Sequence, residues 1–266
     1  MTGDGREPAA LVEQRGNVLV ITINRPEARN AVNGVVSTGV GDALERAQQD
    51  PAVWAVVITG AGDVSFCAGA DLKAIARREN LYHPQHGEWG FAGYVHHFID
   101  KPTIAAVNGA ALGGGTEIAM ASDLVVAAES AVFGLPEVKR GLIAAAGGVF
   151  RVIDALPRKL AFELLFTGEP ITAAEALRWG MINQVVPDGK VLEAALALAE
   201  RVTVNAPLSV QVSKRIACGA DGGVVTDEEA KWERLGRELR SLLKSADARE
   251  GPLAFAEKRQ PVWKAR

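Results

Sequence analysis

The chain has 266 residues, of which 48% are hydrophobic, and its formal net charge is -3 at neutral pH. This is enough apolar material for the buried core of one large domain, or of a core with an appendage. Lys and Arg are spread along the chain, which argues against a nucleic acid or an anionic membrane surface as partner. The apolar runs are broken before spanning length and the first ten residues contain no apolar signal core, so a soluble protein is expected.

Cysteine usage indicates a reducing compartment. The chain has two cysteines, Cys67 and Cys218, without the paired spacing of a disulfide framework or a zinc site. His83, His86, His96 and His97 also lack metal-ligand spacing, and surface or loop roles are expected for all four. We therefore expect a cytoplasmic protein without a metal site.

The first part of the chain alternates strands and helices. Residues 9–15 and 17–23 form a predicted strand pair turning at Gly16-Asn17, and a polar connection over 24–30 follows. Apolar residues from Val36 to Ala47 recur at helical spacing before Asp50-Pro51 ends that helix. Further strands are predicted over 54–59, 65–67, 103–107, 124–128 and 132–133, with a short helix over 95–99 and a turn or short helix at Pro136-Glu137.

The second part is mainly helical. Thr172 and Glu175 are spaced as a capping box for a helix that stops at Gly180, and a last strand is predicted over 183–186. Helices are predicted over 189–203, 206–217, 227–245 and 247–258. This pattern indicates an α/β core over residues 1–200 and a helical C-terminal subdomain over 201–266.

Residues 78–92 are the least regular part of the chain. Long irregular segments inside domains are often functional, so this stretch is interpreted as a mobile loop or lid over a pocket. Tyr82, Trp89 and Phe91 are the candidate pocket residues because aromatic rings supply apolar contact area. The alternative is a variable surface excursion.

The stretch Gly113-Gly114-Gly115-Thr116-Glu117 is the strongest chemical signal. Glycines allow a ligand close to the backbone, and the first N–H groups of the following helix have no partner inside it. Such a donor stabilises a developing negative charge. Glu117 lies about one turn further, among apolar neighbours that raise the pKa of a carboxyl, as acid–base catalysis requires. The alternative is a tight turn for close helix packing, with Glu117 at a solvated edge.

Five motifs in order resemble the crotonase, or enoyl-CoA hydratase/isomerase, superfamily. They are NRPEARNAV at 24–32, FCAGADL at 66–72, KPTIAAVNGAALGGGTEIAMASDL at 101–124, FGLPEVKRGL at 133–142 and EGPLAFAEKR at 250–259. The resemblance covers essentially the whole chain. It implies a crotonase-type spiral of strand-strand-helix turns with a helical C-terminal trimerisation region, assembled as a homo-trimer or a dimer of trimers.

The resemblance also implies the catalytic residues. Ala68 and Gly114 would supply the two backbone N–H groups that hold the thioester oxygen of an acyl-CoA. Glu117 would be the base toward water, and Glu137 the acid toward the α-carbon, so two carboxyls suffice for hydration. By itself Glu137 would be an ordinary acidic residue of a first helical turn. For the FCAGADL motif the alternative is a strand-to-helix turn in which Asp71 caps the helix, and both roles can hold together.

The implied ligand is coenzyme A as part of the substrate, with no tightly bound cofactor. The CoA moiety would lie along Glu27, Ala28 and Arg29 and along the backbone of Ala68, Gly69, Ala70, Asp71 and Leu72, with Arg29 and Lys258 near phosphates. A solvated loop charge is the alternative for Arg29. Cys67 could be a nucleophile with His96 or His97, but a thiol at that place is more often a small buried apolar group.

Three departures from the family pattern bear on the substrate. In the segment 143–148, Ala144-Ala145 stands where family members usually have Pro-Gly; Leu135 replaces a polar residue that is often seen there, and Lys139-Arg140 is more charged than usual. Ala145 keeps its backbone N–H, so hydration is retained unless the position requires a positive φ. The leading hypothesis is a 2-enoyl-CoA hydratase. The alternatives are an isomerase or a specialised dehydratase, as for carnitinyl-CoA, and a non-catalytic acyl-CoA-binding protein.

Overall fold

Two sheets organise residues 7–266, the part of the chain that the computed structural model describes. Residues 1–6, part of the stretch without an apolar signal core, lie outside it. The larger sheet has the order β1-β2-β3-β5-β7-β10, antiparallel only between its first two strands. Its strands are β1 (Ala10–Arg15), β2 (Val18–Ile23), β3 (Ala55–Gly60), β5 (Thr103–Val107), β7 (Leu124–Ala128) and β10 (Gln184–Val186). Every residue of β3 and β5 is buried, as expected of parallel strands covered on both faces.

The smaller sheet contains the second strand of each strand-strand-helix repeat, together with β9. Its order is β4-β6-β8-β9, and β4, β6 and β8 are parallel. The strands are β4 (Ser65–Cys67), β6 (Ala110–Leu112), β8 (Val132–Gly134) and β9 (Ile171–Thr172). Each of the pairs β3/β4, β5/β6 and β7/β8 therefore places one strand in each sheet before a helical segment follows. This arrangement confirms the predicted strand-strand-helix spiral.

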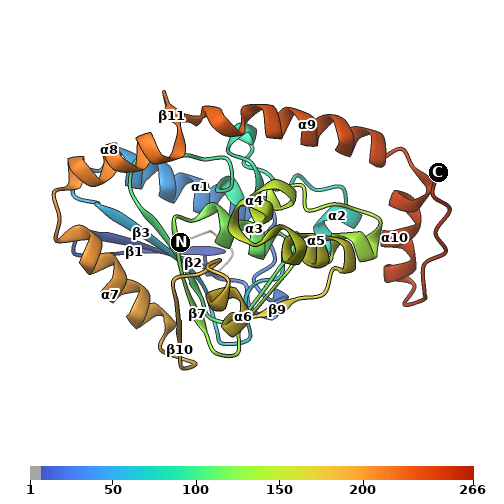
Figure 1. Ribbon diagram of the computed structural model, residues 1–266, viewed down its shortest axis with the longest axis horizontal. Coiled ribbons are helices and arrows are strands. Elements are labelled where there is room, and N and C mark those ends of the chain that lie inside the picture. Colours follow the sequence, from blue (N-terminus) through green and yellow to red (C-terminus); the bar gives the residue numbers. More distant parts are fainter. Residues whose placement is uncertain (1–6) are drawn as a thin grey trace.

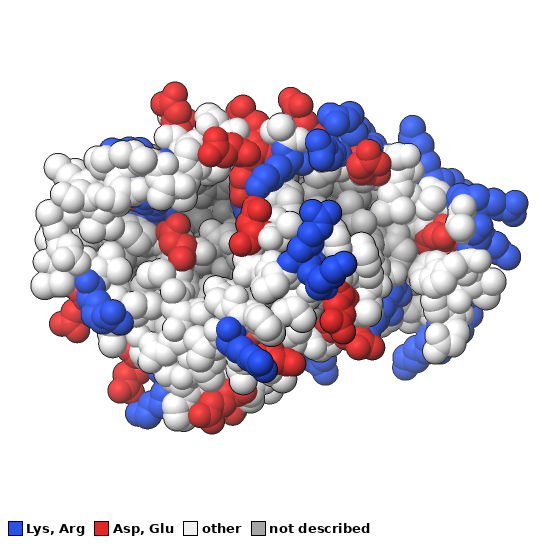
Figure 2. Space-filling view, in the orientation of Figure 1, with Lys and Arg blue, Asp and Glu red and all other residues white. Residues whose placement is uncertain are grey.

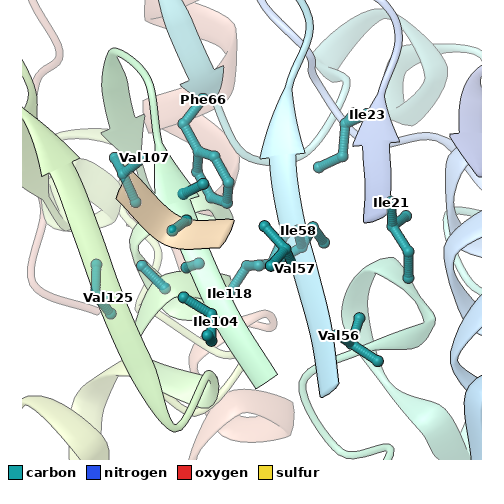
Figure 3. Close-up of a cluster of buried hydrophobic side chains, with 14 of the residues drawn as sticks. Ile21, Ile23, Val56, Val57, Ile58, Phe66, Ile104, Val107, Ile118 and Val125 are labelled. Atoms are coloured by element: carbon teal, nitrogen blue, oxygen red, sulfur yellow. The ribbon is translucent and has the colours of Figure 1, made fainter. Parts of the chain in front are cut away.

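The core lies between the sheets and the helices that cover them. Figure 3 shows side chains from β2, β3, β5 and β7 meeting Ile118 of α3 (Gly114–Ala121) and Phe66 of β4. The helices α1 (Gly34–Gln49) and α7 (Val191–Thr203) pack on the larger sheet, and the side chain of Asn33 caps the start of α1. The core fixes the ends of the short strands from which the functional residues project.

Helices dominate the second half of the chain (Figure 1). The capping box of Thr172 and Glu175 is present at the start of α6, as predicted. The helices are α4 (Gly148–Ala155), α5 (Arg158–Thr167), α6 (Ala173–Arg178), α8 (Pro207–Cys218), α9 (Thr226–Leu242) and α10 (Ala246–Ala256). A short hairpin of β11 (Ala220–Asp221) and β12 (Val224–Val225), which the sequence did not predict, joins α8 to α9. The last helix, α10, packs against η4 (Pro136–Arg140).

The predicted helix over residues 95–99 is wrong. The chain forms α2 (Leu72–Ala76), an irregular stretch, and then the short 3-10 turns η2 (Gly87–Trp89) and η3 (Phe91–Gly93), with no regular element over 97–99. Gly90, Ala92 and Gly93 have positive φ values, which a continuing helix does not tolerate. Val95 and Ile99 are buried individually instead of on one helix face. Within the described residues, no helix is long and apolar enough to cross a membrane.

Candidate active site

The glycine stretch joins β6 to the start of α3. Gly113 has φ 55 and ψ -123, a conformation that favours glycine, and its N–H donates to the carbonyl of Gly134 at 2.8 Å. The hydroxyl of Thr116 donates to the carbonyl of Ala111 in β6 at 2.7 Å and accepts from the N–H of Gly134 in β8 at 3.0 Å. Hydrogen bonds to both neighbouring strands thus fix the start of α3, and the N–H of Gly114 in its first turn has no intrahelical acceptor.

Glu117 is a buried carboxylate held by backbone donors. The residue is 3% exposed, and its Oε1 accepts hydrogen bonds from the N–H groups of Ala146 at 2.7 Å and Gly148 at 2.8 Å. Burial first, and then the nearby Glu137 carboxyl, raise the pKa of Glu117 to about 8, against the two N–H donors, which lower it. The alternative of a solvated edge residue is excluded.

Glu137 faces the same glycine stretch from η4. A Cβ atom built on Gly113 would stand 3.0 Å from Oε1 of Glu137, and Oε2 is buried without a hydrogen-bond partner among residues 7–266. Burial raises the pKa of Glu137 to about 7. A carboxyl with one buried and unsatisfied oxygen is costly for a purely structural residue. The structure therefore brings the two predicted glutamates close together, and the pKa of each is raised toward neutrality.

The prediction that Ala68 is an oxyanion donor does not agree with the hydrogen bonding of its loop. The N–H of Ala68 donates to the carbonyl of Arg29 at 3.0 Å, and the N–H of Gly69 lies 3.4 Å from Sγ of Cys67. The N–H of Ala70 donates to no group within residues 7–266. A Cβ atom on Gly69 would stand 3.1 Å from the nitrogen of Gly114, so this loop lies against the start of α3. Ala70 and Gly114 are thus the available pair of donors.

The predicted CoA segment around Glu27 lies beside the loop that follows β4. Glu27 and Ala28 belong to the 3-10 turn η1 (Pro26–Ala28), and the exposed Arg29 ends it in the left-handed conformation at φ 53. The next residue, Asn30, is fully buried, also has a positive φ, and donates to the carbonyls of Ala61 and Ser65. Two consecutive strained residues outside glycine are often a feature of ligand sites.

Asp71 and Leu72 have different surroundings. Asp71 caps α2 by accepting from two backbone N–H groups, as predicted, and its other oxygen pairs with Arg25 at 2.9 Å. That side chain is 9% exposed and is fully used inside the protein. Leu72 is 48% exposed and open to a ligand. Asp71 therefore orients the loop, and the sequence did not identify Arg25 as its partner.

Lys258 and Arg29 do not line the same hollow. Lys258 lines a hollow of about 550 Å³ between η4, the end of α5 and the C-terminal segment, together with Lys139, Arg140 and Arg259. Arg259 is tied to Glu250 and Glu257 in this region. On the face shown in Figure 2, Lys and Arg gather at the end that holds α10 and the C-terminus. Within one chain, the two predicted phosphate-binding positions do not share this hollow.

The aromatic residues of the 78–92 segment separate into different environments. Phe91 is 8% exposed and packs directly on Gly114, where a Cβ atom would clash with its ring. Trp89 stacks between the rings of His86 and His97, at centroid distances of 4.1 and 4.0 Å, over Gly41 of α1. Tyr82 is 48% exposed. Only Phe91 of the three predicted pocket residues contacts the glycine stretch, and Trp89 packs against α1 instead.

The histidines and Cys67 belong to the supporting structure. His83 is 3% exposed and pairs with Asp42 at 3.1 Å, and the side chain of His97 is 5% exposed beside Glu45. Of the surface or loop roles that were expected, these two residues therefore have the loop role, with buried side chains. Burial raises the pKa of the Cys67 thiol to about 12, which removes it as a nucleophile at neutral pH. Within residues 7–266, no group of three His, Cys, Asp or Glu side chains is placed to hold a metal ion.

The segment after η4 supplies what sequence reasoning missed. From the sequence, we expected Ala145 to be compatible with hydration unless its position required a positive φ. Ala145 does not have a positive φ. The donors to Glu117 are its neighbours Ala146 and Gly148, which no side-chain motif indicates because their backbone groups act. Leu135, in place of a polar residue, is 1% exposed and belongs to the core.

Comparisons with known proteins agree with this fold and with the family that the sequence motifs resemble. The family model described as enoyl-CoA hydratase/isomerase matches residues 13–266. A carnitinyl-CoA dehydratase of Salmonella typhimurium is 43% identical over 256 residues, which is 95% of this chain and 97% of the relative. The crystal structure of a carnitinyl-CoA hydratase from Mycobacterium avium is 77% identical with a TM-score of 0.97, and covers 98% of this chain and 100% of that one. An enoyl-CoA hydratase from Mycobacterium tuberculosis is 44% identical with a TM-score of 0.76 at the same coverage. The chain therefore belongs to the enoyl-CoA hydratase/isomerase family, whose fold it has.

Proposed function

We propose that this protein adds water reversibly across the 2,3 double bond of a 2-enoyl-CoA thioester. The observation that carries the proposal is the pair formed by the buried Glu117 and the half-buried Glu137, both with raised pKa values, beside the start of α3. In the reactive state the proton of the pair lies on Glu137, and the negative charge of Glu117 is stabilised by the N–H groups of Ala146 and Gly148. Glu117 then accepts a proton from water as the water oxygen attacks the β-carbon. Protonated Glu137 delivers a proton to the α-carbon, and the reverse transfers give dehydration. Both carboxyls are needed because two protons move at two different atoms.

The backbone around Gly114 stabilises the charge that develops. Attack at the β-carbon moves electron density onto the thioester oxygen, where the N–H groups of Ala70 and Gly114 donate. Loss of one donor of this kind typically costs about 3 to 4 kcal/mol in the transition state. We assign this role to Ala70 instead of Ala68 because the N–H of Ala68 is already bound to Arg29.

The CoA moiety binds along the two adjoining loops. Glu27, Ala28 and Arg29 face it from one side, and the backbone of residues 68–72 from the other. The exposed Arg29 meets phosphate oxygens. We assign Lys258 to the site of a neighbouring subunit, because the hollow that it lines within one chain does not include Arg29.

Single amide variants test the two-acid mechanism. Glu117→Gln and Glu137→Gln should each reduce the hydration rate at least a hundredfold, while affinity for a CoA ester stays within about threefold. The double variant should be little worse than either single one, because both groups act on one transition state. If Glu137→Gln retained most activity while Glu117→Gln lost it, a one-carboxylate isomerisation would replace hydration.

A carnitinyl-CoA substrate is the second candidate, and specific similarities favour it. The relatives at 77% and 43% identity are described as acting on carnitinyl-CoA. Assaying dehydration of carnitinyl-CoA beside hydration of unsubstituted enoyl-CoA esters of increasing length decides between the two substrates. A non-catalytic acyl-CoA-binding role would show tight binding of these esters without turnover, but two buried carboxyls serve no purpose in a binder.

We also propose assembly as a homo-trimer or a dimer of trimers in the cytoplasm. The support is an exposed apolar stripe at four-residue spacing before and along α8, formed by Val204, Leu208, Val212 and Ile216, three of which are more than 70% exposed. Such a stripe is typical of an interface. Both cysteines are free, which suits a reducing compartment.

A further inference from the structure

The helix α9 has little buried surface of its own. It follows the β11–β12 hairpin and passes above α4 toward α10 in Figure 1. Among its residues, all of which the structure describes, only Leu235 is buried. The position of α9 on the body of the protein therefore depends on a few specific side chains.

Arg151 of α4 and Glu228 of α9 form the strongest of these contacts. Nε and Nη2 of Arg151 donate to the two carboxylate oxygens of Glu228, at 3.0 and 2.6 Å, and Nη2 also donates to the carbonyl of Val95 at 2.8 Å. The side chains are 13% and 18% exposed. A bidentate pair with this degree of burial has fixed geometry and is costly to break from one side.

The pair lies directly on the backbone of Gly147. A Cβ atom on Gly147 would stand 3.0 Å from Nη1 of Arg151 and 3.1 Å from the ring of Trp232, so only glycine admits both side chains. The indole N–H of Trp232 donates to Glu228 at 3.1 Å, and its ring packs edge-on against Phe150. Arg151, Glu228 and Trp232 together form what we call the α9 clasp.

Gly147 separates the two residues that donate to Glu117. The N–H groups of Ala146 and Gly148 both reach the same carboxylate oxygen, so a shift of the backbone at Gly147 moves both donors. We propose that Arg151 and Glu228 are positioning residues: the α9 clasp presses on Gly147 and holds both N–H donors on Glu117. The effect of the α9 clasp on catalysis rests on the proposed function. Its effect on the backbone at Gly147 is independent of that function.

The pH dependence of the reaction rate tests the proposal, because several charged groups act on the pKa of Glu117. Glu137 of η4 and Arg151 of α4 act on Glu117, and Arg151 is faced by Glu228 of α9 and lies near His96. The two N–H donors lower the pKa of Glu117. If Glu228→Gln releases them, the limb of the rate profile that requires ionised Glu117 shifts to higher pH. If Glu228→Gln only removed the negative charge of Glu228 and left the donors in place, Arg151 would be less neutralised and would lower the pKa of Glu117 further. The same limb of the rate profile would then shift to lower pH.

A matched control joins the same two helices. Lys231 of α9 and Asp154 of α4 form an ion pair at 2.8 Å whose side chains are 42% and 63% exposed. Asp154→Asn should change the activity by less than about twofold and leave its pH dependence unchanged, because exposed ion pairs contribute little to the stability of a fold. Glu228→Gln and Arg151→Lys should each reduce kcat about ten- to a hundredfold with KM within about threefold, since small displacements of catalytic groups cost this much.

Amide hydrogen exchange gives a readout that does not need a substrate. In the full-length protein, the peptide over residues 143–150 should exchange at least tenfold faster in Glu228→Gln than in wild type or in Asp154→Asn. If Glu228→Gln does not fold, Trp232→Phe, which keeps an aromatic ring but loses the N–H bond, should show the same change more weakly. Exchange and kcat equal to those of Asp154→Asn, or a rate limb shifted to lower pH, would overturn the proposal. A wild-type protein without hydratase activity would overturn the proposed function, and the exchange data would still decide whether the clasp holds the turn.

Discussion

Gly113 leaves the space that Glu137 occupies: a Cβ atom on Gly113 would stand 3.0 Å from Oε1 of the glutamate. The glycine is therefore needed twice, once for its positive φ and once for the carboxyl that lies against it. Gly113→Ala should reduce hydration at least a hundredfold, because the acid is displaced, and should cost about 1 to 3 kcal/mol of stability through backbone strain.

Gly180→Ala is the matched control for this substitution. Gly180 has φ 80, and a Cβ atom there would meet nothing within 4 Å. This variant should lose stability without losing kcat. Thermal unfolding and steady-state kinetics on both variants separate the two effects, and equal kcat losses would contradict the role of Gly113 in placing Glu137.

The glutamate pair makes stability depend on pH. Both carboxyls have a folded-state pKa raised above 4.5, to about 8 and about 7, so between pH 4.5 and 8 the folded protein binds more protons than the unfolded chain. The free energy of unfolding should therefore fall as pH rises through this window, by up to about 1.4 kcal/mol per pH unit for each proton. Urea unfolding from pH 5 to 8 at fixed protein concentration checks this.

The doubly substituted protein is the reference for that experiment. Glu117→Gln combined with Glu137→Gln removes both titrating groups, and its stability should vary less with pH than that of wild type. An unchanged slope in the double variant would show that other groups cause the dependence.

Trp89 and Phe91 should respond differently to truncation. Trp89→Ala removes a ring stacked between two histidines and should lower stability by about 2 kcal/mol, without changing the preference for acyl-chain length. Phe91→Ala opens space beside Gly114 and should change that preference. Thermal unfolding, together with kcat/KM for enoyl-CoA esters of increasing length, measures both. A changed preference in Trp89→Ala would restore its role as a pocket residue.

The stripe on α8 should control assembly. Replacing Leu208 and Ile216, which are 73% and 76% exposed, by lysine should reduce the mass in sedimentation from three or six chains toward one, because charges are not tolerated at a buried apolar interface. Val64→Lys, at a site 71% exposed outside α8, is the control and should leave the mass unchanged. A stable wild-type monomer at micromolar concentration would contradict the proposed trimer.

The sequence was sufficient to predict the spiral and to single out the two glutamates that the structure brings together. Apolar strand runs, the Thr172 capping box and the order of five motifs are local or ordered signals, and the structure and the family match confirm the fold that they predict. The raised pKa of Glu117 also followed from its apolar neighbours in α3.

Only the tertiary structure decided which backbone N–H groups are available as donors in the candidate site, and which side chains pack against them. The glycine stretch indicated the N–H of Gly114, but a side chain does not show whether its own backbone N–H is already bound. The bound N–H of Ala68, the available N–H of Ala70 and the donors to Glu117 therefore depend on how separate loops meet. Arg151 and Glu228 are 77 residues apart, and their contact arises because α9 is brought back over α4. Local periodicity determines which residues are buried together in one element, whereas contacts between distant segments depend on the packing of the whole chain.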